Sequence, residues 1–489
     1  MTGALMIQGT GSDVGKSLLV AGIARALANR GLRVKPFKPQ NMSNNAAVTI
    51  EGGEIGRAQA LQARAARTPL MNDMNPVLLK PQSQVGAQVV IQGKVWGNSN
   101  AAEFQKIKLG LMDRVLGSFQ RLGQDADIVL VEGAGSPAEV NLRPNDIANM
   151  GFAEAADIPV LLAGDIDRGG VIAQIVGTHL LLSESEKART KGFIINKFRG
   201  DIRLFDDGLT ILETKTGWAN MGVIPYFPNA HRLPPEDAFS LEGRQNSKEG
   251  SLHIVVPVLP HIANFDDLNP LQAEPDVRLD LIRPGNPLPS GANLVLLPGS
   301  KATLADLEVL KSEGWDIDIQ SHLRHGGSIL GICGGFQMLG KTLSDPQGIE
   351  GPAREMPGLG LMDFDTTLTG DKKLLEEAGS ENLFGGDISG YHMHVGDCIG
   401  PALDRPFAKL GSGPDGVISY DGHHMGTYLH GIFANNDFRK QFLSRLTDGT
   451  IAHLDFEEQV ERTLDELAAH LEAHLNIDHL LEVANAASK

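Results

Sequence analysis

The first candidate for chemistry is a cysteine set among glycines. Cys333 lies in the stretch GICGGFQMLG, residues 331–340, and the four residues before it, GSIL, are mostly apolar. This pattern predicts a buried strand, a tight turn at the cysteine and a helix beginning near Phe336, which is the nucleophile-elbow arrangement of hydrolases. Glycines permit the strained backbone, and the amide of Gly334 could donate to an oxyanion. A lone cysteine is most often a small buried residue, but these flanking glycines favour a nucleophile.

A histidine that could activate this thiol stands about a hundred positions later. His430 ends a short apolar run in GTYLHGIF, residues 426–433, and is one of 15 histidines in the chain. Imidazole is the usual partner of a nucleophilic thiol and need only be close in space. The sequence therefore predicts a Cys333–His430 pair.

The N-terminal end carries a phosphate-binding pattern. Residues 6–17, MIQGTGSDVGKS, lead from a short apolar strand into an apolar-periodic helix. A P-loop needs backbone amides around the phosphates, a lysine for the terminal phosphates and a hydroxyl for Mg²⁺, and Ser17 supplies the hydroxyl here. The strict pattern begins with glycine, and Thr10 takes that place. The predicted nucleotide-binding residues of this loop are Thr10, Gly11, Val14, Gly15, Lys16 and Ser17.

Three further residues end predicted strands of the same domain. Lys38 follows VKPF, Glu132 ends the apolar run IVLVE, and Asn196 ends GFIIN. The carboxyl ends of parallel strands are where open sheets bind ligands, and Glu132 suits a magnesium ion. Asn196 could read the nucleotide base.

Both motifs resemble known families. Cys333 with Gly335 and Gln337, then His430, are similar to the nucleophile and base of class I glutamine amidotransferases, which release ammonia from glutamine through a thioester. That resemblance implies Gly299 as the second oxyanion amide. The usual triad places a glutamate two residues after the histidine, where this chain has Ile432. No obvious carboxylate replaces it, and the cobyrinic and cobyric acid amidotransferases also work with a Cys–His pair.

The P-loop resembles that of dethiobiotin synthetases, which implies that Lys38 is a second phosphate-binding lysine. The order of the two parts, together with FKPQNMSNN at 37–45, LPGSK at 297–301 and GYHMHVG at 390–396, resembles the cobyric acid synthase family. An acid is common in that family where this chain has His392.

This resemblance implies an ATP- and glutamine-dependent amide ligase of cobalamin biosynthesis. It would amidate the b, d, e and g carboxylates of adenosylcobyrinic acid a,c-diamide through acyl phosphates, using ATP, Mg²⁺ and glutamine as ammonia donor. Two alternatives stay open: a cobyrinic acid a,c-diamide synthase, and a non-catalytic P-loop ATPase fused to an inactive amidotransferase fold.

The composition of the chain limits its class, its partners and its cellular compartment. The chain has 489 residues, 42% hydrophobic and 21% charged, with a net charge of −17 and two cysteines. The negative charge argues against nucleic-acid partners, and two cysteines exclude a disulfide framework. No apolar run reaches the roughly twenty residues of a membrane span, and no signal peptide is apparent. We expect a cytoplasmic protein, of an oligomeric state that the sequence leaves open.

Alternating strand and helix patterns predict an α/β fold with two doubly wound parallel-sheet domains, P-loop NTPase-like and class I amidotransferase-like, plus C-terminal helices. The expected divisions are an ATP-binding synthetase domain at 1–230, a linker at 231–250, an amidotransferase domain at 251–440 and a helical segment at 441–489. Residues 371–386 read as an exposed insertion.

Overall fold

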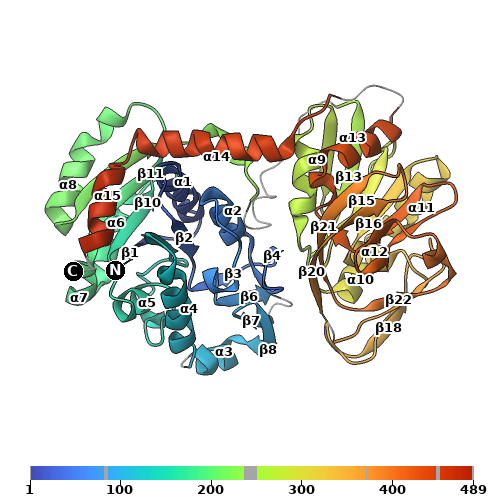
Figure 1. Ribbon diagram of the computed structural model, residues 1–489, viewed down its shortest axis with the longest axis horizontal. Coiled ribbons are helices and arrows are strands. Elements are labelled where there is room, and N and C mark those ends of the chain that lie inside the picture. Colours follow the sequence, from blue (N-terminus) through green and yellow to red (C-terminus); the bar gives the residue numbers. More distant parts are fainter. Residues whose placement is uncertain are drawn as a thin grey trace. The chain divides into compact units, whose positions relative to one another are not determined.

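A computed structural model describes residues 2–81, 86–108, 110–235, 250–370, 372–447 and 452–486 (Figure 1). Their contacts divide the chain into two units. The first holds the described residues of Met1–Ser43, Thr49–Glu236 and Val460–Lys489. The second holds those of Asn44–Val48 and Asp237–Gln459. The first unit therefore includes a C-terminal segment of the chain, and the second unit includes a short N-terminal segment.

A six-stranded parallel sheet forms the centre of the first unit. Its strand order is β12-β11-β10-β1-β9-β2. The bounds are β1 Gly3–Gly9, β2 Val34–Phe37, β9 Ile128–Glu132, β10 Val160–Asp165, β11 Thr190–Phe198 and β12 Ala219–Pro225. β1 and β9 are buried along their whole length, as expected of strands covered on both faces. All six strands run in the same direction, so their carboxyl ends meet at one edge.

Helices connect and cover these strands. They are α1 Lys16–Asn29, α2 Arg57–Ala65, α4 Met112–Gln124, α5 Met150–Ala155, α6 Val171–Leu181, α7 Glu184–Arg189 and α8 Asp206–Thr216. A smaller sheet of order β3-β6-β7-β8 belongs to the same unit, with α3 Ala101–Lys108 after it. Its strands are β3 Gln40–Met42, β6 Val77–Pro81, β7 Gly86–Ile91 and β8 Lys94–Asn100.

The C-terminal helices complete the first unit. These are α14 Phe456–Glu472, which the boundary between the units crosses, and α15 Ile477–Ala486. α14 packs on α1, where Gly22 leaves room for Leu467 and Leu471. The fully buried Arg25 pairs with Glu461 of α14 and, at 3.3 Å, with Asp465. A segment more than 400 positions away in sequence thus covers the helix that follows the P-loop.

The second unit is built on another mainly parallel sheet, of order β14-β13-β15-β16-β26-β25. Only β25 is antiparallel to its neighbour. The strands are β13 Leu252–Pro257, β14 Val277–Ile282, β15 Leu294–Leu297, β16 Ser328–Ile332, β25 Val417–Ile418 and β26 His424–Thr427. The helices are α9 Asn269–Ala273, α10 Thr303–Ser312, α11 Trp315–Arg324, α12 Gly334–Met338 and α13 Asn436–Arg445. Two parallel-sheet domains confirm the predicted α/β class.

Two further sheets lie in the second unit. One has the order β24-β23-β20-β21-β27, with β20 Lys373–Glu381, β21 Asp387–His394, β23 Ala408–Leu410, β24 Gly413–Asp415 and β27 Leu429–His430. The other has the order β18-β17-β19-β22, with β17 Thr342–Asp345, β18 Arg354–Pro357, β19 Asp365–Thr367 and β22 Asp397–Ile399. The interpretation of residues 371–386 as an exposed insertion is wrong. β20 is the central strand of its sheet, and two of its charged residues, Glu377 and Glu381, are buried, so charge in this stretch does not mark an exposed loop.

The predicted divisions at 230, 250 and 440 stay predictions. Residues 236–249, most of the expected linker, lie outside the described part of the chain, and position 440 falls within α13. The described helices after residue 459 cluster with the first unit, an association that no sequence pattern indicates.

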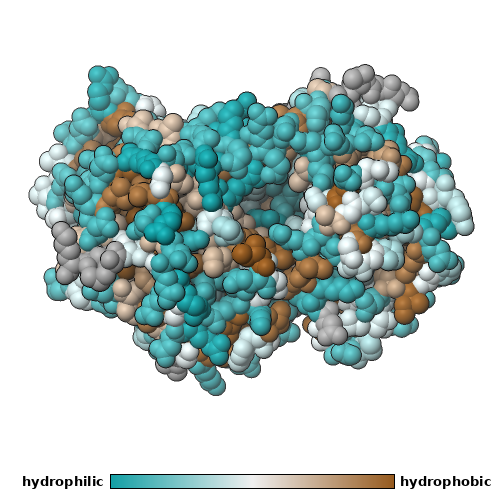
Figure 2. Space-filling model, in the orientation of Figure 1, coloured by the Kyte–Doolittle hydropathy of each residue, from teal (hydrophilic) through white to brown (hydrophobic). Residues whose placement is uncertain are grey.

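Hydrophilic residues dominate the face shown in Figure 2, where apolar residues form small separate patches. Within the described residues, no helix is both long enough and apolar enough to cross a membrane.

Candidate active sites

Cys333 occupies the sharp turn between β16 and α12. Its φ of 52° and ψ of −109° lie outside the regions that non-glycine residues favour. Glycines make this turn possible: a Cβ on Gly331 would lie 2.5 Å from the carbonyl oxygen of Gly335, and one on Gly335 would lie 2.2 Å from that of Leu297. The turn expected at the cysteine is present, with the thiol 6% exposed.

The structure brings His430 to this thiol. His430 lies on β27 and is fully buried, and its imidazole hydrogen-bonds the side chain of Cys333. The ring of Tyr391 stacks on the imidazole with 5.2 Å between centroids, and the Tyr391 hydroxyl donates to Asp266 at 3.3 Å. The stack and the buried strand fix the imidazole plane beside the nucleophile.

A carboxylate orients the histidine from the other side. Asp267 Oδ2 lies 2.7 Å from His430 Nδ1, and Asp267 Oδ1 accepts from the backbone N–H of Gly431 at 2.6 Å. Asp267 is 4% exposed. The imidazole is hydrogen-bonded to both the thiol and the carboxylate, the latter at Nδ1, so the three side chains have the order of a Cys–His–Asp triad.

The charge of Asp267 changes the acidity of the imidazole. Burial by itself lowers the pKa of His430, but the charges of Asp267 and Cys333 and their hydrogen bonds outweigh it and raise the pKa to about 10. An imidazolium with such a partner stabilises a thiolate beside it, which is the nucleophilic form of cysteine.

Sequence reasoning missed this residue. The sequence shows no obvious carboxylate in place of the glutamate absent at Ile432 and leaves open whether any residue replaces it; in the structure Asp267 contacts His430 from 163 positions earlier in the chain. Asp267 lies on the short 3-10 turn Phe265–Leu268 that follows β13. The acidic pair in NFDDLNP, just after a predicted strand, was the only available signal.

Of the two predicted oxyanion glycines, Gly299 lies on the loop after β15 and Gly334 is the first residue of α12. Gly299 follows β15, and a Cβ there would lie 3.0 Å from His430 Cε1 and 2.8 Å from the carbonyl oxygen of Ala263. A Cβ on Gly334 would lie 2.9 Å from the backbone nitrogen of Ser300. A side chain at Gly299 would therefore collide with the imidazole of His430, and one at Gly334 with Ser300.

Hydrogen bonds through Thr303 link the acidic residue Glu350 to Gln337, which lies near the nucleophile in sequence. Gln337, four residues after Cys333, receives a 3.4 Å hydrogen bond from Thr303 Oγ1, and Thr303 also donates to Glu350 through its backbone N–H at 2.5 Å. Burial raises the pKa of Glu350 to about 7, against the opposing charge of Lys301. Glu350 is therefore harder to ionise than an exposed glutamate.

The P-loop is formed as the sequence predicts. Gly15, with a φ of 94°, precedes α1, and Lys16 Nζ donates to the carbonyl oxygens of Gly11 at 2.9 Å and Gly135 at 3.2 Å. Val14 is buried, whereas Thr10 Oγ1 donates to Gln174 at 3.0 Å. The lysine thus bridges the P-loop and the loop that follows β9.

Glu132 gathers three partners at the carboxyl end of β9. Ser17 Oγ and Lys38 Nζ each lie 2.8 Å from Glu132 Oε1, and Gln62 Nε2 donates to Oε2 at 2.5 Å. A serine hydroxyl beside a carboxylate is a set of hard oxygen donors that fits Mg²⁺. Among the described residues no cluster of three His, Cys, Asp or Glu could hold a metal alone, so phosphate oxygens would have to complete the coordination.

Asn196 has a structural contact that was not expected. Its Nδ2 donates to the carbonyl oxygen of Val14 at 2.8 Å, and a Cβ on Gly15 would lie 2.5 Å from the same nitrogen. The next residue, Lys197, donates to Asp165 at 2.8 Å. Asn196 therefore supports the P-loop backbone, and its contact with a base stays a prediction.

Comparison with known proteins agrees with both sites. Residues 5–240 match a CobQ/CobB/MinD/ParA nucleotide-binding domain, and residues 253–438 match a CobB/CobQ-like glutamine amidotransferase domain. Over 486 residues, 99% of this chain, it is 58% identical to the cobyric acid synthase of Azorhizobium caulinodans, whose length is covered completely. Identity to the cobyric acid synthase of Methylorubrum populi is 56%, over 99% of both chains, and to that of Brucella suis 53%, over 99% of this chain. The chain belongs to the cobyric acid synthase family.

Members of the cobyric acid synthase family are glutamine-dependent ligases, and this chain is an enzyme of that class. The nucleotide-binding match contains Lys16, Lys38 and Glu132. The amidotransferase match contains Cys333, His430 and also Asp267, the residue that the sequence alone did not reveal.

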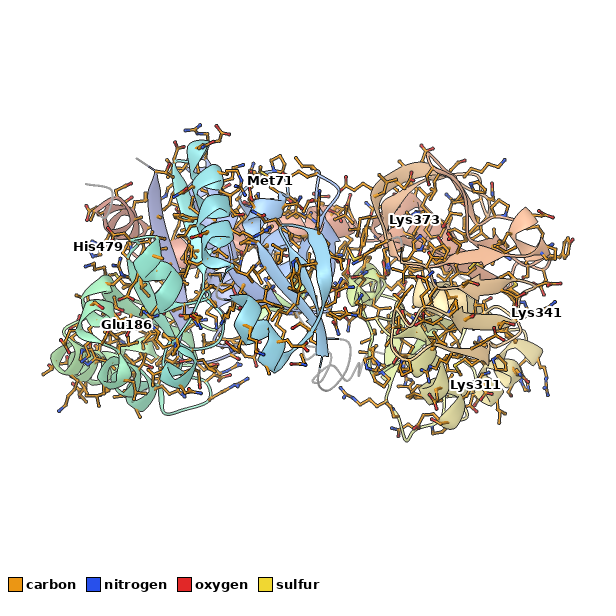
Figure 3. All side chains as sticks on the ribbon, turned by 90° about the horizontal axis from the view of Figure 1, so that it is seen from below. Met71, Glu186, Lys311, Lys341, Lys373 and His479 are labelled. Atoms are coloured by element: carbon orange, nitrogen blue, oxygen red, sulfur yellow. The ribbon has the colours of Figure 1, made fainter. Side chains whose placement is uncertain are left out.

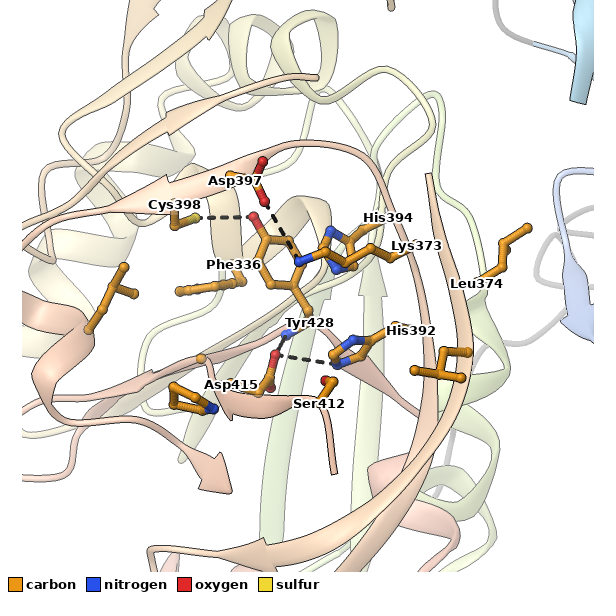
Figure 4. A pocket seen from close by; sticks show the side chains of 14 residues that line it. Phe336, Lys373, Leu374, His392, His394, Asp397, Cys398, Ser412, Asp415 and Tyr428 are labelled. Atoms are coloured by element: carbon orange, nitrogen blue, oxygen red, sulfur yellow. Dashed lines mark hydrogen bonds and ion pairs between the residues drawn. The ribbon is translucent and has the colours of Figure 1, made fainter. Parts of the chain in front are cut away.

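The second unit also has an open pocket of about 640 Å³ (Figure 4). The ring of His394 stacks on Tyr428 at 3.7 Å, His392 Nε2 lies 3.5 Å from Asp415, and Lys373 lies 3.7 Å from Asp397. Lys373, labelled in Figures 3 and 4, comes from β20. Side chains alternate along β21, so the ring of Tyr391 stacks on His430 whereas His392 and His394 line this cavity, and the backbone carbonyl oxygen of Met393 accepts from the Cys333 thiol at 3.7 Å. Burial lowers the pKa of His394 to about 2, so its ring is neutral.

Proposed function

We propose that this enzyme amidates the b, d, e and g carboxylates of adenosylcobyrinic acid a,c-diamide, using ATP and ammonia taken from glutamine. The observation that carries the proposal is the presence in one chain of an intact P-loop site and a buried Cys–His–Asp triad, in a chain 53–58% identical to cobyric acid synthases. One site would make ammonia, and the other would activate the carboxylate that receives it.

In the glutamine site, the Cys333 thiolate attacks the side-chain amide carbon of glutamine. The oxygen of the resulting tetrahedral intermediate takes the negative charge, and the backbone amides of Gly299 and Gly334 would stabilise it. His430, held by Asp267, gives its Nε2 proton to the leaving nitrogen, so ammonia departs and a thioester remains. Water, losing a proton to His430, then cleaves the thioester to glutamate and restores the thiolate.

Glu350 would recognise the amino-acid end of glutamine. The substrate carries an α-ammonium group that needs an anionic partner, and Glu350 is the acid that Thr303 links to Gln337 beside the nucleophile. Because the pKa of Glu350 is raised to about 7, binding would strengthen as the carboxyl ionises between about pH 6 and 8.

In the nucleotide site, a substrate carboxylate attacks the terminal phosphorus of ATP and releases ADP. Lys16 and Lys38 would balance the charge of the transferring phosphoryl group, while Asn196 holds the P-loop backbone. Mg²⁺, held by Ser17 and Glu132 together with phosphate oxygens, would supply further positive charge there. Ammonia then attacks the acyl carbon, and phosphate leaves with the electrons of the carbon–oxygen bond.

Mass spectrometry of adenosylcobyrinic acid a,c-diamide incubated with the enzyme, glutamine, ATP and Mg²⁺ tests the proposal. Four successive mass losses, each equal to the difference between a carboxylic acid and its amide, are expected. Amidation of cobyrinic acid at two positions instead would identify an a,c-diamide synthase. No change of either corrinoid would contradict the assigned substrate.

The division of labour between the sites has its own test. Cys333→Ala should abolish glutamine-dependent amidation and retain activity with ammonium salts, whereas Lys16→Ala should remove both activities. Ammonium-supported activity that also depends on Cys333 would contradict the division.

A further inference from the structure

Helix α2 buries two glutamine side chains, Gln59 and Gln62. Both are 0% exposed, and their three-residue spacing places them on one face of the helix. Water cannot reach a fully buried amide, so the protein groups that it contacts decide how it is held. The two amides contact different groups of the first unit, which allows the effect of one to be measured against the other.

The amide of Gln62 touches both residues that would hold Mg²⁺. Its Nε2 donates to Glu132 Oε2 at 2.5 Å and to the backbone carbonyl oxygen of Ser17 at 3.3 Å. Ser17 Oγ in turn lies 2.8 Å from Glu132 Oε1. One side chain of α2 therefore links the start of α1, after the P-loop, to the carboxyl end of β9.

Only one orientation of the Gln62 amide fits these neighbours. The Glu132 carboxylate and the Ser17 carbonyl oxygen can only accept hydrogen bonds, so they require the NH₂ end of the amide. Rotating the amide by 180° would bring Oε1 against two other acceptors. In the observed orientation Oε1 has no hydrogen-bond partner among the described residues. The contacts of Nε2 with Glu132 and Ser17 thus decide the orientation.

Charge explains why a neutral amide suits this place. Lys38 already puts a cation 2.8 Å from Glu132 Oε1. A second cation on Oε2 would compete with a divalent ion for the same carboxylate, because both are attracted by its negative charge. An amide supplies a hydrogen bond without this competition. It occupies Oε2 and leaves Oε1 beside the hydroxyl of Ser17.

We propose that Gln62 is a positioning residue for the metal site, whose amide holds Glu132 Oε1 and Ser17 Oγ together as ligands for the Mg²⁺ that accompanies ATP. Hydrogen bonds to the ligands of a metal fix their orientation and raise its affinity. The inference rests on the proposed function for the use of ATP and Mg²⁺. Its central quantity, the affinity for the metal, can be measured without corrinoid or glutamine.

Gln59 provides the matched control. Its Oε1 accepts from Asn41 Nδ2 at 3.2 Å, and no hydrogen bond described in the structure joins it to Glu132 or Ser17. Methionine has nearly the length of glutamine but no amide, so Gln59→Met and Gln62→Met each remove one buried amide from the same helix face. Only Gln62→Met removes the hydrogen bond to the Glu132 carboxylate.

The first experiment measures metal affinity directly. Electron paramagnetic resonance of free Mn²⁺, titrated with protein and a non-hydrolysable ATP analogue, gives the dissociation constant of the bound ion. Gln62→Met should weaken Mn²⁺ binding by roughly 10- to 100-fold, as expected when a partner of a metal ligand is removed, and Gln59→Met by less than about twofold. Equal losses in the two variants, or the affinity of the parent protein in Gln62→Met, would overturn the proposal.

Nucleotide binding in EDTA separates positioning of the metal ligands from damage to the P-loop. The affinity of Gln62→Met for the ATP analogue without metal should stay within about twofold of the parent value, because its metal ligands are not then in use. A loss there as large as the loss of Mn²⁺ affinity would show a merely structural role and overturn the proposal. Should Gln62→Met fail to fold, Gln62→Asn keeps an amide on a shorter side chain that cannot reach Glu132. The same weakening of Mn²⁺ binding is expected, and its absence would contradict the proposal.

Ammonium-dependent amidation of adenosylcobyrinic acid a,c-diamide gives a second readout. The Mg²⁺ concentration that gives half the maximal rate should rise for Gln62→Met by the same factor as the dissociation constant for Mn²⁺, and kcat should recover at saturating Mg²⁺. A kcat that stays low at saturating Mg²⁺ would overturn the proposal. If neither the parent protein nor any variant amidates the corrinoid while the Mn²⁺ affinities differ as expected, the proposed function fails and the role of Gln62 stands.

Discussion

At the scale of single residues, the triad depends on a carboxylate that faces a fully buried imidazole. Asp267 reaches His430 Nδ1 at 2.7 Å, and its charge is the main reason that the pKa of His430 rises to about 10 despite burial. A neutral amide in its place would keep the shape and lose the charge, so the imidazolium would no longer be stabilised.

Asp267→Asn should therefore lower kcat for glutamine hydrolysis by roughly 10²- to 10⁴-fold, the range seen when an orienting carboxylate is neutralised in other triads. Ammonium-dependent amidation should be retained, because it does not use the triad. Glutamate release and amide formation, measured on the same preparation, check both expectations. An unchanged kcat would mean that the Cys–His pair works without the third member.

The same substitution should change how stability depends on pH. The pKa of His430 is raised from 6.5 to about 10 on folding, so the stabilisation is complete below about pH 6.5 and is lost as pH rises toward 10. One proton corresponds to about 1.4 kcal/mol per pH unit in this window. Urea unfolding at a series of pH values should show a shallower decline for Asp267→Asn than for the parent protein. An equal decline of stability with pH in both proteins would mean that the stabilising proton binds to a group other than His430.

Glu350 gives a prediction about substrate binding. Because its pKa is raised to about 7 by burial, the KM for glutamine should fall as pH rises from about 6 to 8. Glu350→Gln should raise KM by roughly tenfold or more, the loss of one charged hydrogen bond, and remove that pH dependence with little effect on kcat. A proportional loss in kcat would mean that Glu350 acts in the chemical step instead.

Residue types and local spacing predicted the parts of each site that are contiguous in sequence. Cys333 and the P-loop lysine each sit at a strand-to-helix turn, where the glycine pattern alone dictates the backbone. Asp267 could not be predicted in the same way, because it reaches His430 through a turn 163 positions distant in the chain. Only the fold brings it to the imidazole.

At the scale of elements, the close packing of α14 on α1 leaves no room for a side chain at Gly22. A Cβ on Gly22 would lie 2.5 Å from Leu471 Cδ1 and 2.8 Å from Leu467 Cγ, whereas one on Gly177 in α6 would meet nothing within 4 Å. Both glycines lie within helices, so the intrinsic gain from alanine is the same, about 0.5–1 kcal/mol.

Gly22→Ala should therefore destabilise the nucleotide-binding unit by about 1–3 kcal/mol through overpacking, while Gly177→Ala should stabilise it slightly. Thermal unfolding of the two variants beside the parent protein checks the difference. Equal shifts for both would mean that Leu467 and Leu471 can move aside without cost.

At the scale of the whole chain, sequence order is a poor guide to which parts belong together. Local patterns predicted two parallel-sheet domains in the right order, because each strand and helix carries its own apolar periodicity. They could not show that residues from 460 onward cluster with the N-terminal unit, or that Asn44–Val48 clusters with the C-terminal one, because amphipathic helices and short apolar strands do not specify their partners.

Truncation after Gln459 tests the first of these assignments. It would remove the partners of Arg25, a fully buried guanidinium that contacts Glu461 and Asp465, and would expose the apolar face of α1. Removing the partners of a buried charge is strongly destabilising, so the truncated chain should lose ATP binding and ammonium-dependent amidation. Glutamine hydrolysis should persist, because Cys333, His430 and Asp267 belong to the second unit and no hydrogen bond or ion pair described in the structure joins them to residues 460–486. Adding a peptide of residues 456–486 should restore part of the ATP binding. Retention of full ATP affinity after truncation would mean that the C-terminal helices only cover a unit that folds without them.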